Sequence, residues 1–201
     1  MKRTAFVKNL AMAITSASVM LVGNVASAQV INIDGIEYNL GEQIFSTGGN
    51  VEATILEGNP SASFISELRL FNSLETNGDF TLIGTSQQVG TTVNLGIFPS
   101  GEELFFGIYV PNNDQTYLLG PANRNPNNII HAGVATLPSG VINVTFEDSE
   151  NGGDFSYNDV QFQVSGAVST RSQSVPEPGT FLGILFAGGI GISKLKSGKK
   201  L

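Results

Sequence analysis

One acidic segment of the sequence carries the residue types that bind a hard cation. Residues 146–160 contain five carboxylates and two asparagines between two apolar runs. Ca²⁺ takes about six to eight oxygen ligands from carboxylates, carbonyl groups and water. Since the Gly152-Gly153 pair lets the segment fold back on itself, we expect four side chains to converge on a calcium ion: Asp148, Asp154, Asn158 and Asp159.

A second interpretation of the same segment, as a purely structural acidic turn, stays open. Its spacing does not match the EF-hand pattern of alternating acidic residues followed by glycine. Aspartate and asparagine side chains also occur in turns simply because they accept hydrogen bonds from nearby backbone amides. The residues alone therefore leave both a calcium site and an acidic turn possible, and no other cofactor is indicated.

The second candidate is the long segment from Gly120 to Ala132, which is too long for a tight hairpin and too rich in asparagine for a strand. Loops of this length in a compact domain are usually functional. We therefore interpret it as a candidate binding loop with three polar residues, Asn125, Asn127 and His131.

Catalysis is not indicated by the sequence. His131 is the only histidine, and the Gly-x-Ser-x-Gly, phosphate-loop and His-Glu-x-x-His motifs are all absent. A glycosidase needs two carboxylates facing one cleft, whereas the adjacent Glu147 and Asp148 would face opposite ways on a strand. We expect a non-enzymatic protein, with a hydrolase of unrecognised type as the more remote alternative.

The elements that position these residues follow from period-two alternation. Two alternating runs flank Asp34-Gly35, a strong β-hairpin signal. Many short runs with regular turns predict an all-β fold, an antiparallel, jelly-roll-like β-sandwich of roughly eight to ten strands over residues 29–165. The clearest further runs are Val51/Ala53/Ile55, Phe64/Ser66/Leu68/Leu70, Val93/Leu95, Phe106/Ile108/Val110, Ile142/Val144/Phe146 and Val160/Phe162/Val164.

The N-terminus is typical of a secretory signal peptide. A short basic region is followed by an uncharged, mostly apolar run, which we expect to form the signal helix. After this run, small residues at Ala26 and Ala28 give a signal-peptidase cleavage pattern, with the cut before Gln29. We therefore predict a signal peptide over residues 1–28, removed by signal peptidase, and an exported mature chain.

The exported part is strongly acidic. Between Gln29 and Val175, three arginines stand against sixteen carboxylates, which gives a net charge of −13. This field repels phosphate backbones, so nucleic acid is not expected as a partner. The absence of cysteine excludes disulfides and thiolate metal sites.

The C-terminus combines three parts in a specific order. A small, polar linker over residues 166–174 precedes the triplet Pro176, Glu177 and Pro178, and then an apolar helix over residues 180–195 and a basic end. Those sixteen residues reach about 24 Å as a helix, which is short for a bilayer core of about 30 Å and predicts transient membrane anchoring. The basic end would stay on the cytoplasmic side.

This arrangement over residues 175–201 resembles the PEP-CTERM sorting signal of bacterial exported proteins. The resemblance implies that a membrane protease-transpeptidase, an exosortase, recognises Pro176, Glu177 and Pro178 and processes the chain near them.

The segment from residue 102 to 166 resembles a second family, the bacterial domain of unknown function 4114. The matching motifs are Phe-Glu-Asp, Gly-Gly-Asp and Tyr-Asn-Asp in the acidic segment, together with Asn125-Pro126 and His131 upstream of it. Asn127-Asn128 and Ser156 stand where the family usually has Asp-Gly and Asp, so fewer carboxylates are available here. The resemblance implies a secreted protein and no particular activity.

Together these features predict an exported, non-enzymatic protein of the cell surface or extracellular matrix, sorted through its C-terminal tail. The alternative is a Ca²⁺-dependent binding module for an extracellular polysaccharide, with the asparagine and aspartate loops forming its site.

Overall fold

The computed structural model of the protein describes residues 29–58 and 64–170. Over these ranges the chain is all-β and antiparallel, as predicted, and its only helical segments are two single 3-10 turns, η1 (Ala122–Arg124) and η2 (Glu150–Gly152). The strands are β1 (Val30–Ile33), β2 (Ile36–Leu40), β3 (Ile44–Ser46), β4 (Gly49–Leu56), β5 (Glu67–Phe71), β6 (Phe80–Thr85), β7 (Thr92–Phe98), β8 (Phe105–Val110), β9 (Gln115–Leu118), β10 (Ala132–Thr136), β11 (Ile142–Phe146), β12 (Val160–Ser165) and β13 (Ala167–Ser169).

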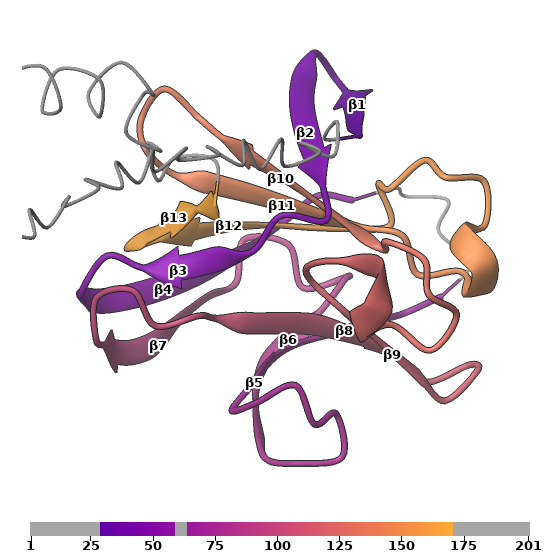
Figure 1. The fold of residues 1–201 in the computed structure, drawn as a ribbon, viewed down its shortest axis with the longest axis horizontal. Helices are drawn as coiled ribbons and strands as arrows, with labels where there is room; N and C mark the ends of the chain where they lie inside the picture. Colours follow the sequence, from indigo (N-terminus) through magenta and orange to yellow (C-terminus); the bar gives the residue numbers. More distant parts are fainter. Residues whose placement is uncertain (1–28, 59–63, 171–201) are drawn as a thin grey trace, which may run out of the picture.

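The strands form three antiparallel sheets. A seven-stranded sheet has the order β1-β2-β10-β11-β12-β4-β7, and a four-stranded sheet has the order β6-β5-β8-β9. The third sheet is the pair β13-β3. In Figure 1, β10, β11 and β12 of the larger sheet lie above β5, β6 and β8 of the smaller one.

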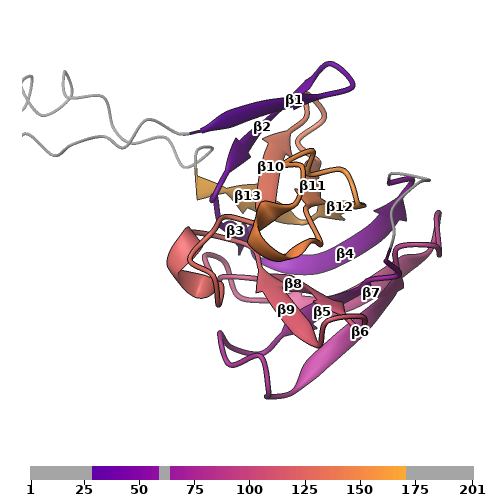
Figure 2. The ribbon, with the colours of Figure 1, turned by 90° about the vertical axis from the view of Figure 1, so that its right-hand side faces the viewer.

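One hydrophobic core joins the two larger sheets. Alternate residues of β11 and β12, such as Val144 and Phe162, are fully buried in the same cluster as Phe106 of β8 and Leu68 of β5. The rings of Phe106 and Phe162 lie 5.2 Å apart, centroid to centroid, across the two sheets. Figure 2 shows the same facing layers from the side. The period-two alternation of these strands thus turns their apolar residues toward one core.

The hairpin predicted at Asp34-Gly35 is confirmed. Strands β1 and β2 pair up to Ile33 and Ile36, which leaves a two-residue turn. Both turn residues have positive φ angles, 52° at Asp34 and 83° at Gly35. This is the backbone that a type I′ turn requires, and Asp-Gly is one of the sequences that adopts it.

The described residues form more strands than the sequence predicts. The alternation predicts roughly eight to ten, whereas residues 29–58 and 64–170 form thirteen. Among the additional strands, β3 and β13 have three residues and β9 has four. A run of three or four residues is too short to display alternation, and its pairing is decided by neighbouring strands rather than by local pattern.

The fold also extends beyond the boundary predicted at residue 165. Residues 166–174 were expected to form a linker, but Ala167–Ser169 form β13 and pair with β3. Ala167 is buried in the core, so this small, polar-looking segment is held by packing and by the ladder with β3.

No helix within residues 29–58 and 64–170 is long and apolar enough to cross a membrane. The predicted signal helix, the apolar helix over residues 180–195 and the sorting tail lie outside the described residues.

Candidate metal centre

The acidic segment connects two neighbouring strands of the larger sheet. Strands β11 and β12 are antiparallel, and their ladder ends at the pair Phe146 and Val160. Glu147 and Asp148 directly follow the end of β11, and Asp159 directly precedes β12. The register therefore places the two carboxylates leaving β11 opposite the one entering β12.

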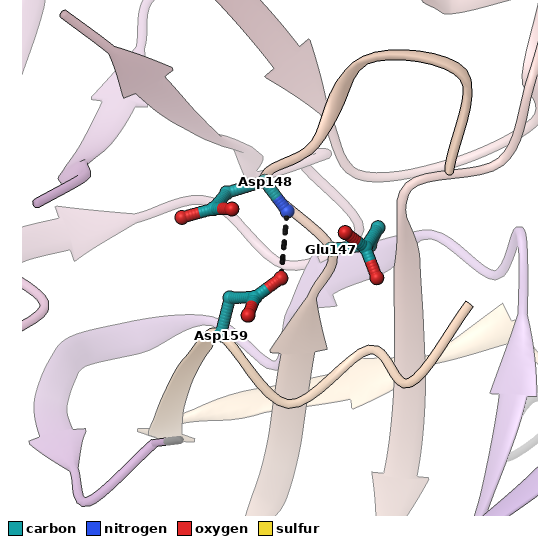
Figure 3. A group of neighbouring side chains, drawn as sticks. All are labelled: Glu147, Asp148 and Asp159. Atoms are coloured by element: carbon teal, nitrogen blue, oxygen red, sulfur yellow. Dashed lines mark hydrogen bonds between the residues drawn. The ribbon is translucent and has the colours of Figure 1, made fainter. Parts of the chain in front are cut away.

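Three carboxylates meet at this point. One carboxylate oxygen from each of Glu147, Asp148 and Asp159 lies within 4.8 Å of the other two. The backbone N–H of Asp148 donates to Oδ2 of Asp159 at 3.1 Å, which fixes Asp159 against the start of the loop (Figure 3). On the other side, the hydroxyl of Ser66 donates to Oδ2 of Asp148 at 2.9 Å.

Glu147 is the least satisfied of the three. Its side chain is 1 % exposed, and Oε1 accepts a hydrogen bond from the backbone N–H of Ser149 at 3.1 Å. Oε2 is buried and has no hydrogen-bond partner among the described residues. A buried carboxylate oxygen without a donor is costly, because the oxygen loses its hydration and no hydrogen bond replaces it.

The cluster is also electrostatically unfavourable. Burial, followed by the charge of Asp159, raises the pKa of Glu147 to about 7 and the pKa of Asp148 to about 6. Two unit charges 4.8 Å apart repel by about 3 kcal/mol at an effective dielectric constant of about 20.

No cationic side chain among the described residues relieves this repulsion. Arg69 pairs with Glu67 at 2.6 Å and Arg124 pairs with Glu103 at 2.7 Å, and these are the only arginines in residues 29–58 and 64–170, which contain no lysine. The cluster is neutralised either by protons or by a cation from solution.

Two glycines shape the loop around the cluster. A Cβ atom on Gly153, whose φ is +49°, would lie 2.6 Å from Oε1 of Glu147. A Cβ atom on Gly152 would lie 2.3 Å from the ring of Phe155. The Gly152-Gly153 pair thus lets the loop fold back closely over Glu147, as the sequence indicates.

The structure brings together two of the four residues expected to hold calcium. Asp148 and Asp159 belong to the cluster. Asp154 is exposed and accepts a hydrogen bond from the backbone N–H of Ser156 at 2.9 Å, the kind of local bond expected of an acidic turn. Hydrogen bonds to Ser156, and to a lesser extent to the Glu147 side chain, lower the pKa of Asp154, but its carboxylate does not belong to the cluster. Asn158 is likewise engaged locally, since its Oδ1 accepts from the Ser156 hydroxyl at 2.9 Å.

Glu147 is a member of the cluster that the sequence does not predict. Adjacent residues face opposite ways within a strand, but Glu147 and Asp148 both lie beyond the last residue of β11. The sequence does contain a signal for this arrangement. Glu147 and Asp148 directly follow one predicted strand, and Asp159 directly precedes the next. A hairpin flanked by carboxylates on both sides brings them together whatever its loop contains.

The candidate binding loop is ordered by its own polar groups. Asn125 is buried, and its side chain accepts from the N–H of Leu118 at 2.8 Å and donates to the carbonyl of Ile129 at 2.9 Å. It therefore closes the loop and is not exposed for a ligand. Asn127 is half-buried and bonds to His131 at 2.9 Å between Nδ2 and Nε2.

His131 lies beneath this loop and beside the cluster. It is fully buried, and its Nδ1 is 3.0 Å from the carbonyl oxygen of Glu147. Because a carbonyl only accepts, Nδ1 carries the hydrogen, and Nε2 is left to accept from Asn127. Burial lowers the pKa of His131, which favours this neutral form.

The other predicted sites concern processing. The sorting triplet Pro176, Glu177 and Pro178 and the cleavage residues Ala26 and Ala28 lie outside the described residues. Gln29 is exposed at the start of the fold, where its carbonyl accepts from the N–H of Leu40 at 2.8 Å.

Comparison with known proteins assigns no family to the chain. No protein-family model matches it, and no curated protein or solved structure matches it either.

Proposed function

We propose that this chain is an exported, non-enzymatic protein of the cell surface or extracellular matrix, and that its domain is a β-sandwich that binds Ca²⁺ at Glu147, Asp148 and Asp159. The two facing sheets and their common core support the sandwich. The calcium site modifies the set expected from the sequence: Glu147 enters it, and Asp154 and Asn158 leave it.

The buried Oε2 of Glu147 carries the calcium proposal. Together with the nearby oxygens of Asp148 and Asp159 it offers a cation three carboxylate ligands, and the cation would supply the charge that the surrounding protein lacks. Ca²⁺ fits better than Mg²⁺, which is usually held by one or two carboxylates and keeps several waters. A transition metal would favour imidazole, but both nitrogens of His131 are hydrogen-bonded.

Export rests on sequence features rather than on the described fold. Three features suit a protein outside the cell: the signal-peptide pattern over residues 1–28, the tail over residues 175–201 that resembles the PEP-CTERM signal, and the net charge of −13 between them. Extracellular fluid supplies calcium at concentrations that weaker sites can use, with dissociation constants of about 10⁻⁴–10⁻³ M.

The non-enzymatic interpretation is supported by the surroundings of His131. Its ring is buried and stacked on Tyr117, and its nitrogens are occupied, so the imidazole is not placed to accept a proton from a substrate. The alternative of an unrecognised hydrolase gains no support from this arrangement.

Calorimetric titration of the purified full chain with CaCl₂ tests the cation site. The wild type should bind one ion per molecule, and Asp148→Asn and Asp159→Asn should each reduce the affinity strongly. Glu150→Gln is the matched control, because it removes an exposed carboxylate that lies in the same loop but outside the cluster, and it should leave binding unchanged. Absence of binding by the wild type, or an equal loss in Glu150→Gln, would contradict the assignment.

The sorting proposal has a separate test. Replacing Pro176, Glu177 and Pro178 by alanine in a host that has an exosortase should abolish processing and change the location of the protein. An unchanged mature mass and location would show that the tail is not a sorting signal.

A further inference from the structure

A small polar cavity lies between the candidate binding loop and the acidic segment. Its volume is about 160 Å³, and its lining comes from β9, from the loop between β9 and β10, and from η2: Gln115, Tyr117, Pro126, Asn127 and Glu150. Cavities for drug-sized ligands measure about 300–1,000 Å³, so this one suits a single ring.

The lining keeps hydrogen-bonding capacity for a ligand. Asn127 uses one amide hydrogen for His131 and one lone pair for the N–H of Ile129, which leaves one donor and one acceptor position. The Tyr117 hydroxyl accepts from Nδ2 of Asn113 at 3.5 Å, so its own hydrogen remains to donate. The Gln115 amide and the Glu150 carboxylate add further donors and acceptors.

These groups match hydroxyls better than charged ligands. Amides, a phenol and a carboxylate pair with alcohol groups, which both donate and accept. Tyr117 and the Pro126 ring supply an apolar wall against which a sugar ring packs. An anionic ligand is disfavoured by Glu150 and by the charge of −13 between residues 29 and 175.

His131 connects this cavity to the carboxylate cluster. The rings of Tyr117 and His131 stack with their centroids 3.8 Å apart and their planes inclined by 9°. His131 also bonds to Asn127 at 2.9 Å and to the carbonyl of Glu147 at 3.0 Å. Tyr117 and Asn127, which line the cavity, therefore both contact His131. His131 is in turn hydrogen-bonded to the backbone carbonyl of Glu147 in the cluster.

We propose that this cavity binds one hexose unit of a neutral extracellular polysaccharide, and that calcium at the cluster strengthens that binding through His131. The inference rests on the proposed calcium site for its coupling, but not for the cavity itself. When Ca²⁺ holds Glu147, the backbone contact to His131 is fixed, and with it the positions of Asn127 and Tyr117. By reciprocity, the sugar must then raise the affinity for calcium by the same factor.

NMR titration tests the cavity on the ¹⁵N-labelled full chain. The probes are the methyl glycosides of glucose, galactose and mannose, each added to a calcium-saturated and to an EDTA-treated sample. At least one glycoside should shift the amide signals of Gln115, Tyr117, Asn127 and Glu150, with higher affinity in the calcium-saturated sample.

Variants locate the binding. Gln115→Ala should weaken the affinity for the glycoside about two- to tenfold, the effect of one lost hydrogen bond. Thr116→Ala is the matched control, because it lies on the same strand but points to its opposite face, and it should bind like the wild type. Neither variant touches the carboxylate cluster, so calcium binding should be unchanged in both.

Three results would contradict the sugar site or its coupling to calcium. Absence of these shifts with every glycoside, in a protein that still binds calcium, would overturn the sugar site and leave the cation site standing. Shifts produced by ethanolamine instead would show that the cavity takes an amine and would also overturn the proposal. Equal glycoside affinity with and without calcium would refute the coupling.

Discussion

Replacing Glu147 by glutamine is the most informative single change in the carboxylate cluster. Glutamine keeps the length and shape of the side chain but removes its charge, and its amide can donate to Asp159 as well as accept from Ser149. The variant therefore separates the charge of Glu147 from its packing, which a change to alanine would not.

The expected effect follows from the direction of the pKa shift. The pKa of Glu147 rises from its ordinary value of 4.5 to about 7 in the folded protein. A raised pKa means that the protonated group stabilises the fold fully below pH 4.5, and that this contribution is lost as the pH rises through 7. At about 1.4 kcal/mol per pKa unit, the loss for Glu147 amounts to about 3 kcal/mol.

Asp148 adds a similar loss over a lower range, because its pKa rises from 3.8 to about 6. Without calcium, the free energy of unfolding of the wild type should therefore decrease steadily from about pH 4 to pH 8. In Glu147→Gln the part of this decrease above about pH 6 should disappear, and the variant should exceed the wild type by up to about 3 kcal/mol at pH 8.

Urea unfolding followed by circular dichroism measures these values, with EDTA present throughout. Glu75→Gln, an exposed substitution elsewhere, controls for the change in net charge. A wild-type free energy of unfolding that is constant over this pH range would refute the account of the cluster. So would a Glu147→Gln profile that parallels the wild type.

Three further changes test the surroundings of the site. Gly153→Ala places a Cβ atom 2.6 Å from Oε1 of Glu147, so thermal denaturation should show a lower melting temperature and calorimetry a weaker affinity for calcium; a variant equal to the wild type in both would contradict the loop geometry. Asn125→Ala removes the hydrogen bonds that close the candidate binding loop and should reduce the free energy of unfolding in urea by about 1–3 kcal/mol, whereas an unchanged value would show that the loop is held by other contacts. His131→Phe keeps a ring beside β9 but cannot bond to Asn127 or to the Glu147 carbonyl, so it should remove the effect of calcium on glycoside affinity; retained coupling would exclude His131 as the connection.

Local pattern was sufficient where the strands are long and alternate clearly. The turn at Asp34-Gly35 and the buried faces of β11 and β12 follow from turn chemistry and period-two alternation alone. The three-residue strands β3 and β13 did not, because their pairing depends on packing between segments far apart in the chain.

The same division holds for the site. The acidic segment was identifiable from composition, and Asp148 and Asp159 were among the expected ligands. Predicting that Glu147 belongs to the cluster requires the register of β11 and β12, because the register places residues 147 and 159 opposite each other. The stacking of Tyr117 on His131 joins β9 to the residue preceding β10, and no local pattern indicates such a contact.

The location of the cation tests the central claim most directly. Crystals of the protein grown with Ca²⁺, with Tb³⁺ exchanged in for anomalous scattering, would show where the ion binds. The account predicts one strong anomalous peak coordinated by Oε2 of Glu147 and by carboxylate oxygens of Asp148 and Asp159. A structure with no peak there, or with the ion bound instead by Asp154 or Asn158, would contradict it.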